Sequence, residues 1–488
     1  MAATTYTGTR NGDRLSARTS GDTLEGLGGN DILSSGTTAL SGVKLFGGDG
    51  NDTLIAKDSD ALIDGGLGLD TVQFSAVVTT GLLDDELVGV EKVQITNTAT
   101  AAYSFANQSE ALDITGARAA DHITGGSGND TITGGLGADT LIGGNGDDVL
   151  LADAADALID GGVGSGAGIG GGNDTVQFAA AVSGLTDGEL LYVENVVIAN
   201  TGNAAYDFSQ QTEALNIQGG RGRDTITGGA AADTLSGGNG NDLLIASSDD
   251  ALVDGGAGND TVKYAAAVSN LTDAELTNVE YVLITYTGDA EYNFSSQTEG
   301  LDITGNTGAD IIKGGSGADA LRGGQGDDHL YAGDNDKLID GGNDADTAYF
   351  AASVSAKNLM DGDLINVETL TITGTGAYDF SAQSEKLVIT AVGVAGAVTI
   401  TGGKGADTLT GGSGDDVIVA SDSDMIDGGD AADNDTVRFG AAVSKLNLLD
   451  GDLVDIDNIV ITNTKAATYD FSLQGEVFNI TGGSGNDT

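Results

Sequence analysis

The chain has 488 residues, of which 80 are Gly, and it contains no Pro, no Cys and no Trp. Aromatic residues make up only 5% of it, which argues against a thick globular core, while a hydrophobic content of 39% is too high for a disordered polymer. The formal net charge of −55 disfavours nucleic acid as a partner and insertion into anionic membranes. The lack of Cys excludes disulfides and thiolate metal sites.

The chain begins with MAATTYTGTRNGDRL, which shows no charged segment followed by an apolar one, so no Sec-type export signal is expected there. Three nine-residue segments follow from Gly8, namely GTRNGDRLS, ARTSGDTLE and GLGGNDILS, and each has Asp at position six. Arg10, Arg14 and Arg18 form a basic cluster in this otherwise acidic chain. An ordinary solvated turn is the simpler interpretation of that cluster.

The nine-residue pattern is clearest from Gly125, where the chain reads GGSGNDTIT, GGLGADTLI and GGNGDDVLL, and it returns from Gly219, Gly314 and Gly402. Gly at positions one, two and four permits positive φ and a sharp turn with converging carbonyls. Asp at position six adds a carboxylate, and such a set of oxygens suits Ca²⁺ better than Mg²⁺ or Zn²⁺. The residues that follow are β-prone, so Ile132 or Leu141 is expected on an inner face.

Stretches of about 45 residues without the glycine turn separate these arrays. In the third stretch TVKY, VEYVLIT, YNF and LDIT alternate apolar and polar residues, which predicts strands, and LTDAEL could form one helical turn capped by Thr272 or Asp273. A Tyr-x-Phe pair recurs in every copy, as at Tyr103 and Tyr206. Core filling is the favoured role for these pairs, and a carbohydrate-binding stripe is the alternative.

A longer period of about 90 residues is marked by the phrase IDGG or VDGG and by QSEALDITG and its variants. It divides the chain into five tandem repeat units, which cover residues 1–116, 117–219, 220–305, 306–391 and 392–488. We expect one continuous solenoid in which wider turns alternate with glycine turns. Five small β-domains are the alternative, but Pro-rich or Ser-rich linkers that would separate them are missing.

The nonapeptides resemble the GGxGxDxUx repeat of the RTX (repeats-in-toxin) family, over about half of the chain. The resemblance implies an all-β fold, an elongated parallel β-solenoid of the β-roll type, with several Ca²⁺ ions held between turns n and n+2. Carried over residue by residue, it pairs Asp121 with Asp139, Asp130 with Asp148, Asp224 with Asp242, Asp242 with Asp260, Asp310 with Asp328, and Asp52 with Asp70. The full set of implied metal ligands is Asp13, Asp31, Asp52, Asp70, Asp121, Asp130, Asp139, Asp148, Asp224, Asp233, Asp242, Asp260, Asp310, Asp319, Asp328, Asp407, Asp416 and Asp487.

Three places depart from the repeat and are expected to hold ions less well. Residues 228–233 read GGAAAD, residues 341–346 read GGNDAD, and the insertion GVGSGAGIGGGND interrupts the period at residues 162–174. A GxGxxG match at Gly166, Gly168 and Gly171 lies inside that insertion without a following helix, so it carries no cofactor prediction.

An enzyme is not expected. The chain has two His, His122 and His329, both at position seven of a nonapeptide, where the side chain is predicted to face outward. HExxH and GxSxG motifs are missing, and repeats account for the whole sequence.

The sequence therefore predicts an extracellular or cell-surface structural protein that folds on binding Ca²⁺ and assembles head to tail with copies of itself into a filament, sheath or surface layer. The alternatives are a rigid spacer of a larger adhesin, for which a cell-surface glycan is a candidate partner, or the calcium-binding region of a secreted enzyme. The resemblance implies type 1 secretion from a Gram-negative bacterium, although the usual non-repetitive C-terminal signal is not seen. The final GGSGNDT, Gly482–Thr488, is half of a glycine turn and is the predicted subunit joint.

Overall fold

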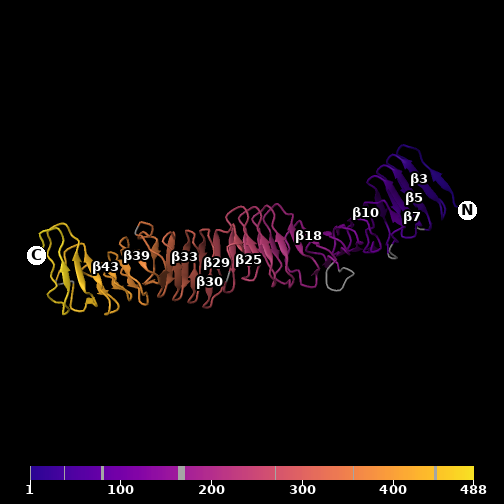
Figure 1. The fold of residues 1–488 in the computed structure, drawn as a ribbon. Coiled ribbons are helices and arrows are strands. Elements are labelled where there is room, and N and C mark those ends of the chain that lie inside the picture. The colour runs from indigo at the N-terminus through magenta and orange to yellow at the C-terminus, as the bar shows by residue number, and fades with distance from the viewer. Residues whose placement is uncertain are drawn as a thin grey trace. The chain divides into compact units, whose positions relative to one another are not determined.

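The computed structural model describes residues 2–37, 39–78, 82–162, 171–269, 271–355, 357–444 and 448–488. Within these ranges the chain forms strands β1 to β48 and no helix. Within each sheet, nearly every strand pairs in parallel with the strand two positions later, so that β6 (Thr53–Ala56) lies beside β8 (Thr71–Phe74). Successive turns of the chain therefore stack, as Figure 1 shows, and the fold is a parallel β-solenoid.

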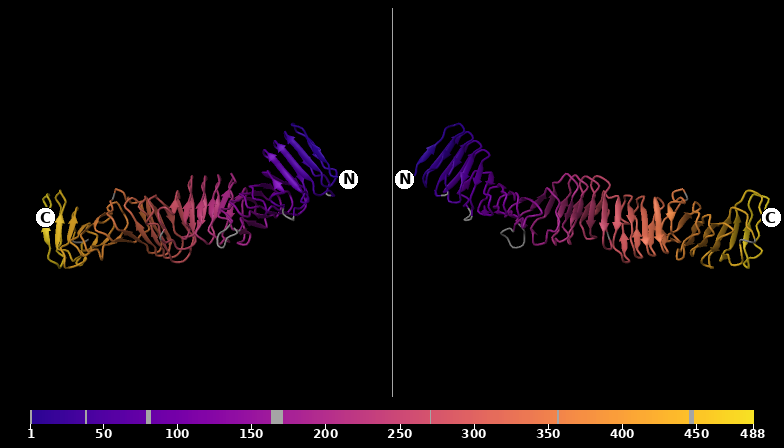
Figure 2. Two further views of the ribbon diagram at one scale, coloured as in Figure 1. Left: turned by 45° about the vertical axis from the view of Figure 1, so that its right-hand side comes forward. Right: turned by 180° about the vertical axis from the view of Figure 1, so that it is seen from behind.

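The core is a narrow row of side chains contributed by consecutive strands. Strands β14 (Thr131–Thr133) and β15 (Thr140–Ile142) belong to different sheets, and the middle residue of each points inward. Ile132 and Leu141 are both fully buried, which confirms the predicted inner face. Because side chains alternate along a strand, β14 and β15 each contribute one core residue and leave its two neighbours half-buried. Figure 2 gives two further views of these stacked strands.

The wider turns fill the same core with aromatic side chains. Tyr103 and Phe105 are fully buried, and the ring of Phe105 lies 6.0 Å from that of Phe74. The equivalent pair Phe178 and Phe208 repeats this contact at 6.2 Å. The Tyr-x-Phe pairs of the first four copies are therefore core residues. The predicted helical turn in LTDAEL is instead a single hydrogen-bonded turn, in which the Glu275 N–H donates to the Thr272 carbonyl at 3.1 Å.

The chain divides into two compact units. The first holds residues 1–244, 249–252 and 256–258, and the second holds 245–248, 253–255 and 259–488. Inside the first unit, β12 (Asp113–Thr115) pairs with β14 across the repeat boundary predicted after residue 116. Inside the second unit, β31 (Asp302–Thr304) pairs with β33 (Ala320–Gln325) across the boundary after residue 305. At these two places the boundaries separate sequence repeats and not separately folded domains.

None of the described residues forms a helix long and apolar enough to span a membrane. His122 is exposed, as predicted, whereas His329 is half-buried and its ring meets the edge of Tyr349 at 5.2 Å.

Candidate metal centres in the glycine turns

The glycine turn from Gly47 to Asp52 needs its first and second glycines for different reasons. In the turn Gly47–Asp52, Gly48 has φ of 106° and Gly50 has φ of 137°, which side chains rarely adopt. Gly47 has no positive φ, which differs from the expectation for position one. It is required because a Cβ added there would lie 2.3 Å from Oδ2 of Asp52 and 2.3 Å from the Gly65 carbonyl oxygen. The turn thus brings a carboxylate oxygen and a carbonyl oxygen of the next turn toward one point.

The carboxylates of successive turns on one edge form a ladder. The Asp31 N–H donates to Oδ1 of Asp52, and the Asp52 N–H donates to Oδ1 of Asp70, both at 2.7 Å. The same bond joins four more of the predicted pairs, with distances of 2.7 to 2.8 Å: Asp121 to Asp139, Asp130 to Asp148, Asp224 to Asp242, and Asp310 to Asp328. Each turn is therefore tied to the turn two positions later through one carboxylate oxygen.

The turns fall into two classes, which differ in whether the other carboxylate oxygen, Oδ2, accepts a hydrogen bond. In the first class, which we call open turns, Oδ2 is buried and accepts no hydrogen bond, although the whole side chain is at most 2% exposed. A buried charged oxygen without a partner is strongly unfavourable, so it indicates a place for a cation or a proton. The open turns end at Asp31, Asp52, Asp70, Asp121, Asp139, Asp148, Asp174, Asp224, Asp310, Asp328, Asp346 and Asp435.

In the second class, which we call closed turns, Oδ2 accepts a hydrogen bond from the backbone of its own turn. The Gly126 N–H donates to Oδ2 of Asp130 at 2.6 Å, and Gly126 has no positive φ. In the open turn ending at Asp148, by contrast, Gly144 has φ of 121°. Among the predicted ligands, those in closed turns are Asp13, Asp130, Asp233, Asp319, Asp407 and Asp416. Their second oxygen is already satisfied, so their chemistry differs from that of the open turns.

Three predicted ligands lie outside this comparison. The two residues of the predicted pair Asp242 and Asp260 belong to different compact units. Asp487 follows β48 (Asn479–Thr481) and is half-buried.

The sequence interpretation missed several members of the ladders. Asp174, Asp346 and Asp435 end open turns, two of them at the places where the repeat is irregular. Glu91, Glu194, Glu280, Glu368 and Asp457 stand at the far end of a ladder and accept the N–H of the last Asp in it. A signal was present, because VEKV, VENV, VEYV and VETL recur once in each of the first four units.

Burial raises the pKa of carboxyl groups in open turns, such as Asp31, and in closed turns, such as Asp130. For Asp148 and Asp328 desolvation is the largest cause, the neighbouring Asp residues add to it, and the pKa rises to about 7. The pKa of Asp310 rises to about 6, also chiefly through desolvation. In the closed turn that ends at Asp22, hydrogen bonds led by that of the Thr19 hydroxyl hold the carboxyl pKa well below its usual range.

The donor set of an open turn suits a hard cation. Among the described residues no three His, Cys, Asp or Glu side chains are close enough together to hold a metal ion. A cation between two open turns would therefore take most of its ligands from backbone carbonyls and only one or two from Asp. Ca²⁺ accepts six to eight oxygen ligands of this mixed kind in flexible geometry.

One turn contains a cation of its own. The Lys57 side chain is 9% exposed, and its Nζ donates to the carbonyl oxygens of Ser35, Thr37 and Leu40 at 3.1, 2.7 and 3.2 Å. These carbonyls belong to the turn between β4 (Ile32–Ser34) and β5 (Lys44–Asp49), which has no Asp at position six. The ammonium group there satisfies the converging carbonyl oxygens by donating hydrogen bonds to them.

Replacing Lys57 with Met is expected to lower the free energy of unfolding by about 1–3 kcal/mol, because it leaves buried carbonyls without a donor. The loss should be equal at low and at saturating calcium, since the lysine needs no ion. Lys44→Met is the control, because Lys44 is exposed on the neighbouring strand. Thermal unfolding of both variants at two calcium concentrations measures the effect, and a loss that disappears in high calcium would contradict it.

In calcium-free solution the fold is expected to be more stable at pH 5 than at pH 8. Folded carboxyl groups such as Asp148 and Asp174 have a raised pKa, of about 7 and about 6, so the folded chain binds more protons than the unfolded chain above pH 4. This stabilisation is complete at low pH and is lost as the pH rises through 6 to 7. Circular dichroism melts in chelator across this range test it, and stability that rises with pH would refute it.

The two classes of turn predict different effects of Asp→Asn. In Asp148→Asn the amide replaces the unpartnered oxygen, so calcium affinity should fall at least tenfold at the adjoining slots while the calcium-free chain is no less stable. In Asp130→Asn the amide meets the Gly126 or Leu112 N–H, each of which now donates to Asp130. That variant should be destabilised with or without calcium. Calcium titrations of the two variants distinguish the classes, and equal behaviour would refute the division.

Comparison with protein families agrees with this geometry. A family model described as the RTX calcium-binding nonapeptide repeat matches residues 7–37, 44–73, 115–165, 216–244, 233–262, 304–336, 314–348, 390–418 and 401–435. Together these segments cover about half of the chain. No curated protein matched the sequence.

Proposed function

Because the chain belongs to the RTX calcium-binding nonapeptide repeat family, we propose that it is a secreted structural protein whose solenoid folds when Ca²⁺ ions bind between successive glycine turns. The observation that carries this proposal is the row of buried carboxylate oxygens without a partner in the open turns. A set of backbone carbonyls next to each one completes the donor chemistry that Ca²⁺ prefers. We propose no catalytic role, because repeats account for the sequence.

The charge of the chain supports a role outside the cell. A formal net charge of −55 opposes compaction unless cations neutralise it. At the low calcium of a cytosol the chain would stay unfolded, which suits export as a linear polymer, and the higher calcium outside would fold it. Type 1 secretion is the route that the family membership suggests.

The finer proposal is that copies of the chain assemble head to tail. Ile480 in β48 is 53% exposed and Val477 before it is 94% exposed, whereas Ile459 on the paired strand β47 (Asn458–Ile461) is buried. A further parallel strand would cover these apolar side chains. Acidic residues such as Asp450 and Glu476 are exposed in the same turns.

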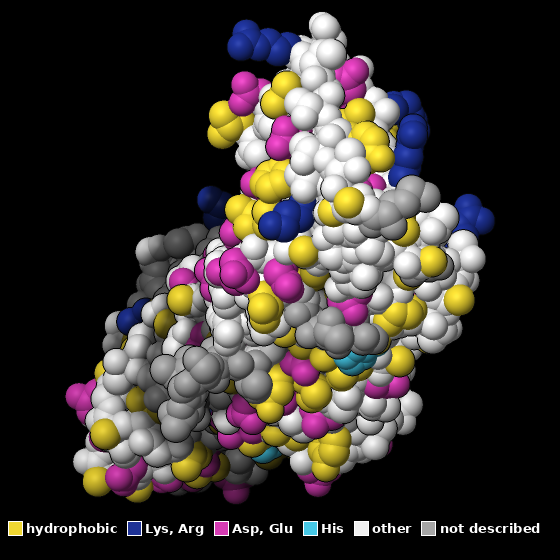
Figure 3. All heavy atoms as spheres, turned by 90° about the vertical axis from the view of Figure 1, so that its right-hand side faces the viewer, with side chains coloured by type: hydrophobic (Ala, Val, Ile, Leu, Met, Phe, Trp, Pro, Cys, Tyr) yellow, Lys and Arg dark blue, Asp and Glu magenta, His cyan; other side chains and the backbone are white. Residues whose placement is uncertain are grey.

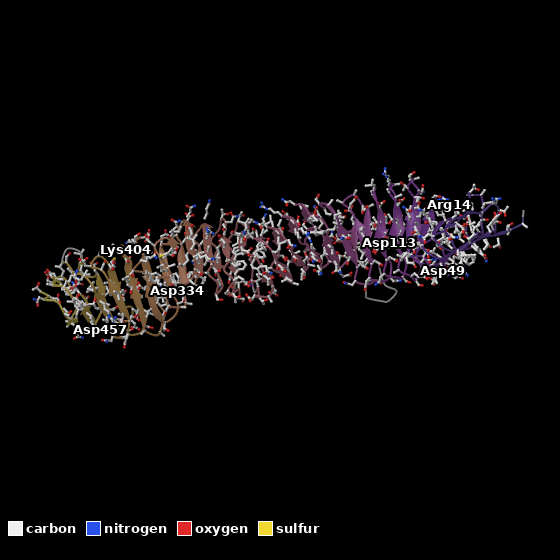
Figure 4. All side chains as sticks on the ribbon, turned by 90° about the horizontal axis from the view of Figure 1, so that it is seen from above. Arg14, Asp49, Asp113, Asp334, Lys404 and Asp457 are labelled. Atoms are coloured by element: carbon white, nitrogen blue, oxygen red, sulfur yellow. The ribbon has the colours of Figure 1, made fainter. Side chains whose placement is uncertain are left out.

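The first turns offer the complementary charge. Arg10, Arg14 and Arg18 are exposed, and Arg18 lies over the Tyr6 ring at 5.7 Å. Figure 3 faces the side where the N-terminus lies and shows Lys and Arg side chains projecting from the surface, and Figure 4 labels Arg14. Basic side chains in the segment of Arg10 to Arg18 and acidic side chains around β48 favour contact between these two segments of different copies.

Electron microscopy and sedimentation of the purified chain, in millimolar calcium and in chelator, test this function. We expect calcium-dependent fibres or sheets that dissolve in chelator, and a variant with Arg10, Arg14 and Arg18 all changed to Glu should remain monomeric while it still folds. Arg221→Glu with Arg223→Glu is the control, since both side chains are exposed elsewhere. Single monomers of the unchanged chain in calcium would contradict assembly and favour the spacer role.

A further inference from the structure

Five of the carboxylate ladders end on a wide turn, which has no GGxGxD sequence. In this turn a left-handed residue is followed by Val or Ile and then by an acid: Gly89-Val90-Glu91, Tyr192-Val193-Glu194, Asn278-Val279-Glu280, Asn366-Val367-Glu368 and Asp455-Ile456-Asp457. The left-handed residues have φ between 51° and 57°, although only one of them is Gly. Side chains rarely adopt this backbone conformation, so its recurrence in all five copies points to a specific use.

The carbonyl oxygen of the left-handed residue takes the position that the carbonyl oxygen of the first glycine occupies in a glycine turn. A Cβ added at Gly65 would lie 2.0 Å from the Gly89 oxygen and 2.8 Å from Oδ2 of Asp70. At Gly161 the corresponding distances are 2.1 Å to the Tyr192 oxygen and 2.5 Å to Oδ2 of Asp174. The same pair of oxygens meets near Gly341 and near Gly428. This repeats the arrangement of Asp52 and Gly65 between two glycine turns.

The acidic residue of the wide turn resembles the Asp of a glycine turn in its hydrogen bonding. The N–H of Asp70 donates to Oε2 of Glu91 at 2.8 Å, as the N–H of Asp52 donates to Asp70. Asp174 and Asp346 donate to Glu194 and Glu368 at 2.8 Å, and Asp435 donates to Asp457 at 3.0 Å. Figure 4 labels Asp457. The wide turn thus provides a carboxylate in ladder register.

Beside each of these wide turns, one carboxylate oxygen of the last Asp in the ladder has no hydrogen-bond partner. Oδ2 of Asp70, Asp174, Asp346 and Asp435 accepts no hydrogen bond, and each of these side chains is at most 1% exposed. It lies between the glycine turn and the left-handed carbonyl, beside a second carboxylate. A buried carboxylate, a second carboxylate beside it and converging carbonyl oxygens together favour a positive ion at this place.

We propose that each of these wide turns closes one additional Ca²⁺ slot, in which the last Asp of the ladder, the left-handed carbonyl and the Glu or Asp of the wide turn serve as ligands. The inference rests on the proposed function, because it takes calcium as the ion of the glycine turns. It adds slots that a count of GGxGxD pairs omits and gives the wide turns a role in binding.

The test counts ions on the full-length chain by equilibrium dialysis with Ca²⁺ alone. A variant carrying Glu91→Gln, Glu194→Gln and Glu368→Gln keeps an acceptor for the ladder N–H and removes the charge. We expect it to bind one ion fewer for each substituted copy, while the remaining ions bind with unchanged affinity. The matched control changes Glu110, Glu213 and Glu299 to Gln, which are exposed in the same kind of repeat, and it should retain every ion.

An unchanged ion count and affinity in the Glu91, Glu194 and Glu368 variant would overturn the inference and leave the proposed function intact. If the unchanged chain bound no calcium, the proposed function would fail and the inference with it. If circular dichroism shows that the triple variant does not fold, the single variant Glu194→Gln replaces it in the test. We expect that variant to bind one ion fewer, and an unchanged ion count would contradict the proposal.

Discussion

Removal of calcium with a chelator at pH 8 is expected to unfold the chain, and restoring calcium should refold it. Each ion that binds only the folded chain stabilises it by about 2.7 kcal/mol when its concentration is a hundred times the dissociation constant. Several such ions together match the whole stability of an ordinary domain, which is about 5–15 kcal/mol. Without them the buried carboxylates of neighbouring open turns, such as Asp52 and Asp70, repel one another.

Far-UV circular dichroism and size-exclusion chromatography measure this transition. An equal concentration of Mg²⁺ should not restore the fold, because Mg²⁺ demands a smaller octahedral site and gives up water reluctantly. A chelated chain that keeps its strand signal and melts cooperatively at pH 8 would show that the carboxylates are neutralised in another way.

Replacing Gly47 with Ala is expected to cause a large loss of stability in the first open turns. The new Cβ would lie 2.3 Å from Oδ2 of Asp52 and 2.3 Å from the Gly65 oxygen, so two potential ligands must move and the stacked turns must separate. Overpacking alone costs about 1–3 kcal/mol, and loss of the adjoining ion adds to it.

Hydrogen exchange measured along the chain should show the loss as faster exchange in β5, β6 and the strands that pair with them. Gly188→Ala is the matched control, because a Cβ at Gly188 meets no atom within 4 Å and Gly188 has no positive φ. Protection in Gly47→Ala equal to that of the control would mean that the turn does not need this close approach.

The sequence by itself determined the features that one turn of chain encodes. Gly at fixed positions, Asp at position six and one aliphatic residue before the next turn recur within nine residues, so the β-solenoid, the inner face of Ile132 and Leu141, and the pairing of turns such as Asp52 and Asp70 follow from the period. The buried Tyr-x-Phe pairs follow in the same way from the longer period. Regular repetition makes such local rules additive along the chain.

Only the tertiary structure decided how each carboxylate is used, because that depends on the turn stacked against it. Asp130 and Asp148 end turns that share the GGxGxD pattern, GGSGND and GGNGDD. The Gly126 N–H nevertheless donates to Asp130, while Gly144 is left-handed and Oδ2 of Asp148 is left without a hydrogen bond. Nζ of Lys57 donates to the carbonyl oxygen of Thr37, 20 residues earlier in the chain. Oε2 of Glu91 accepts a hydrogen bond from the N–H of Asp70, 21 residues earlier. Contacts of this length arise from stacking, so no nine-residue pattern contains them.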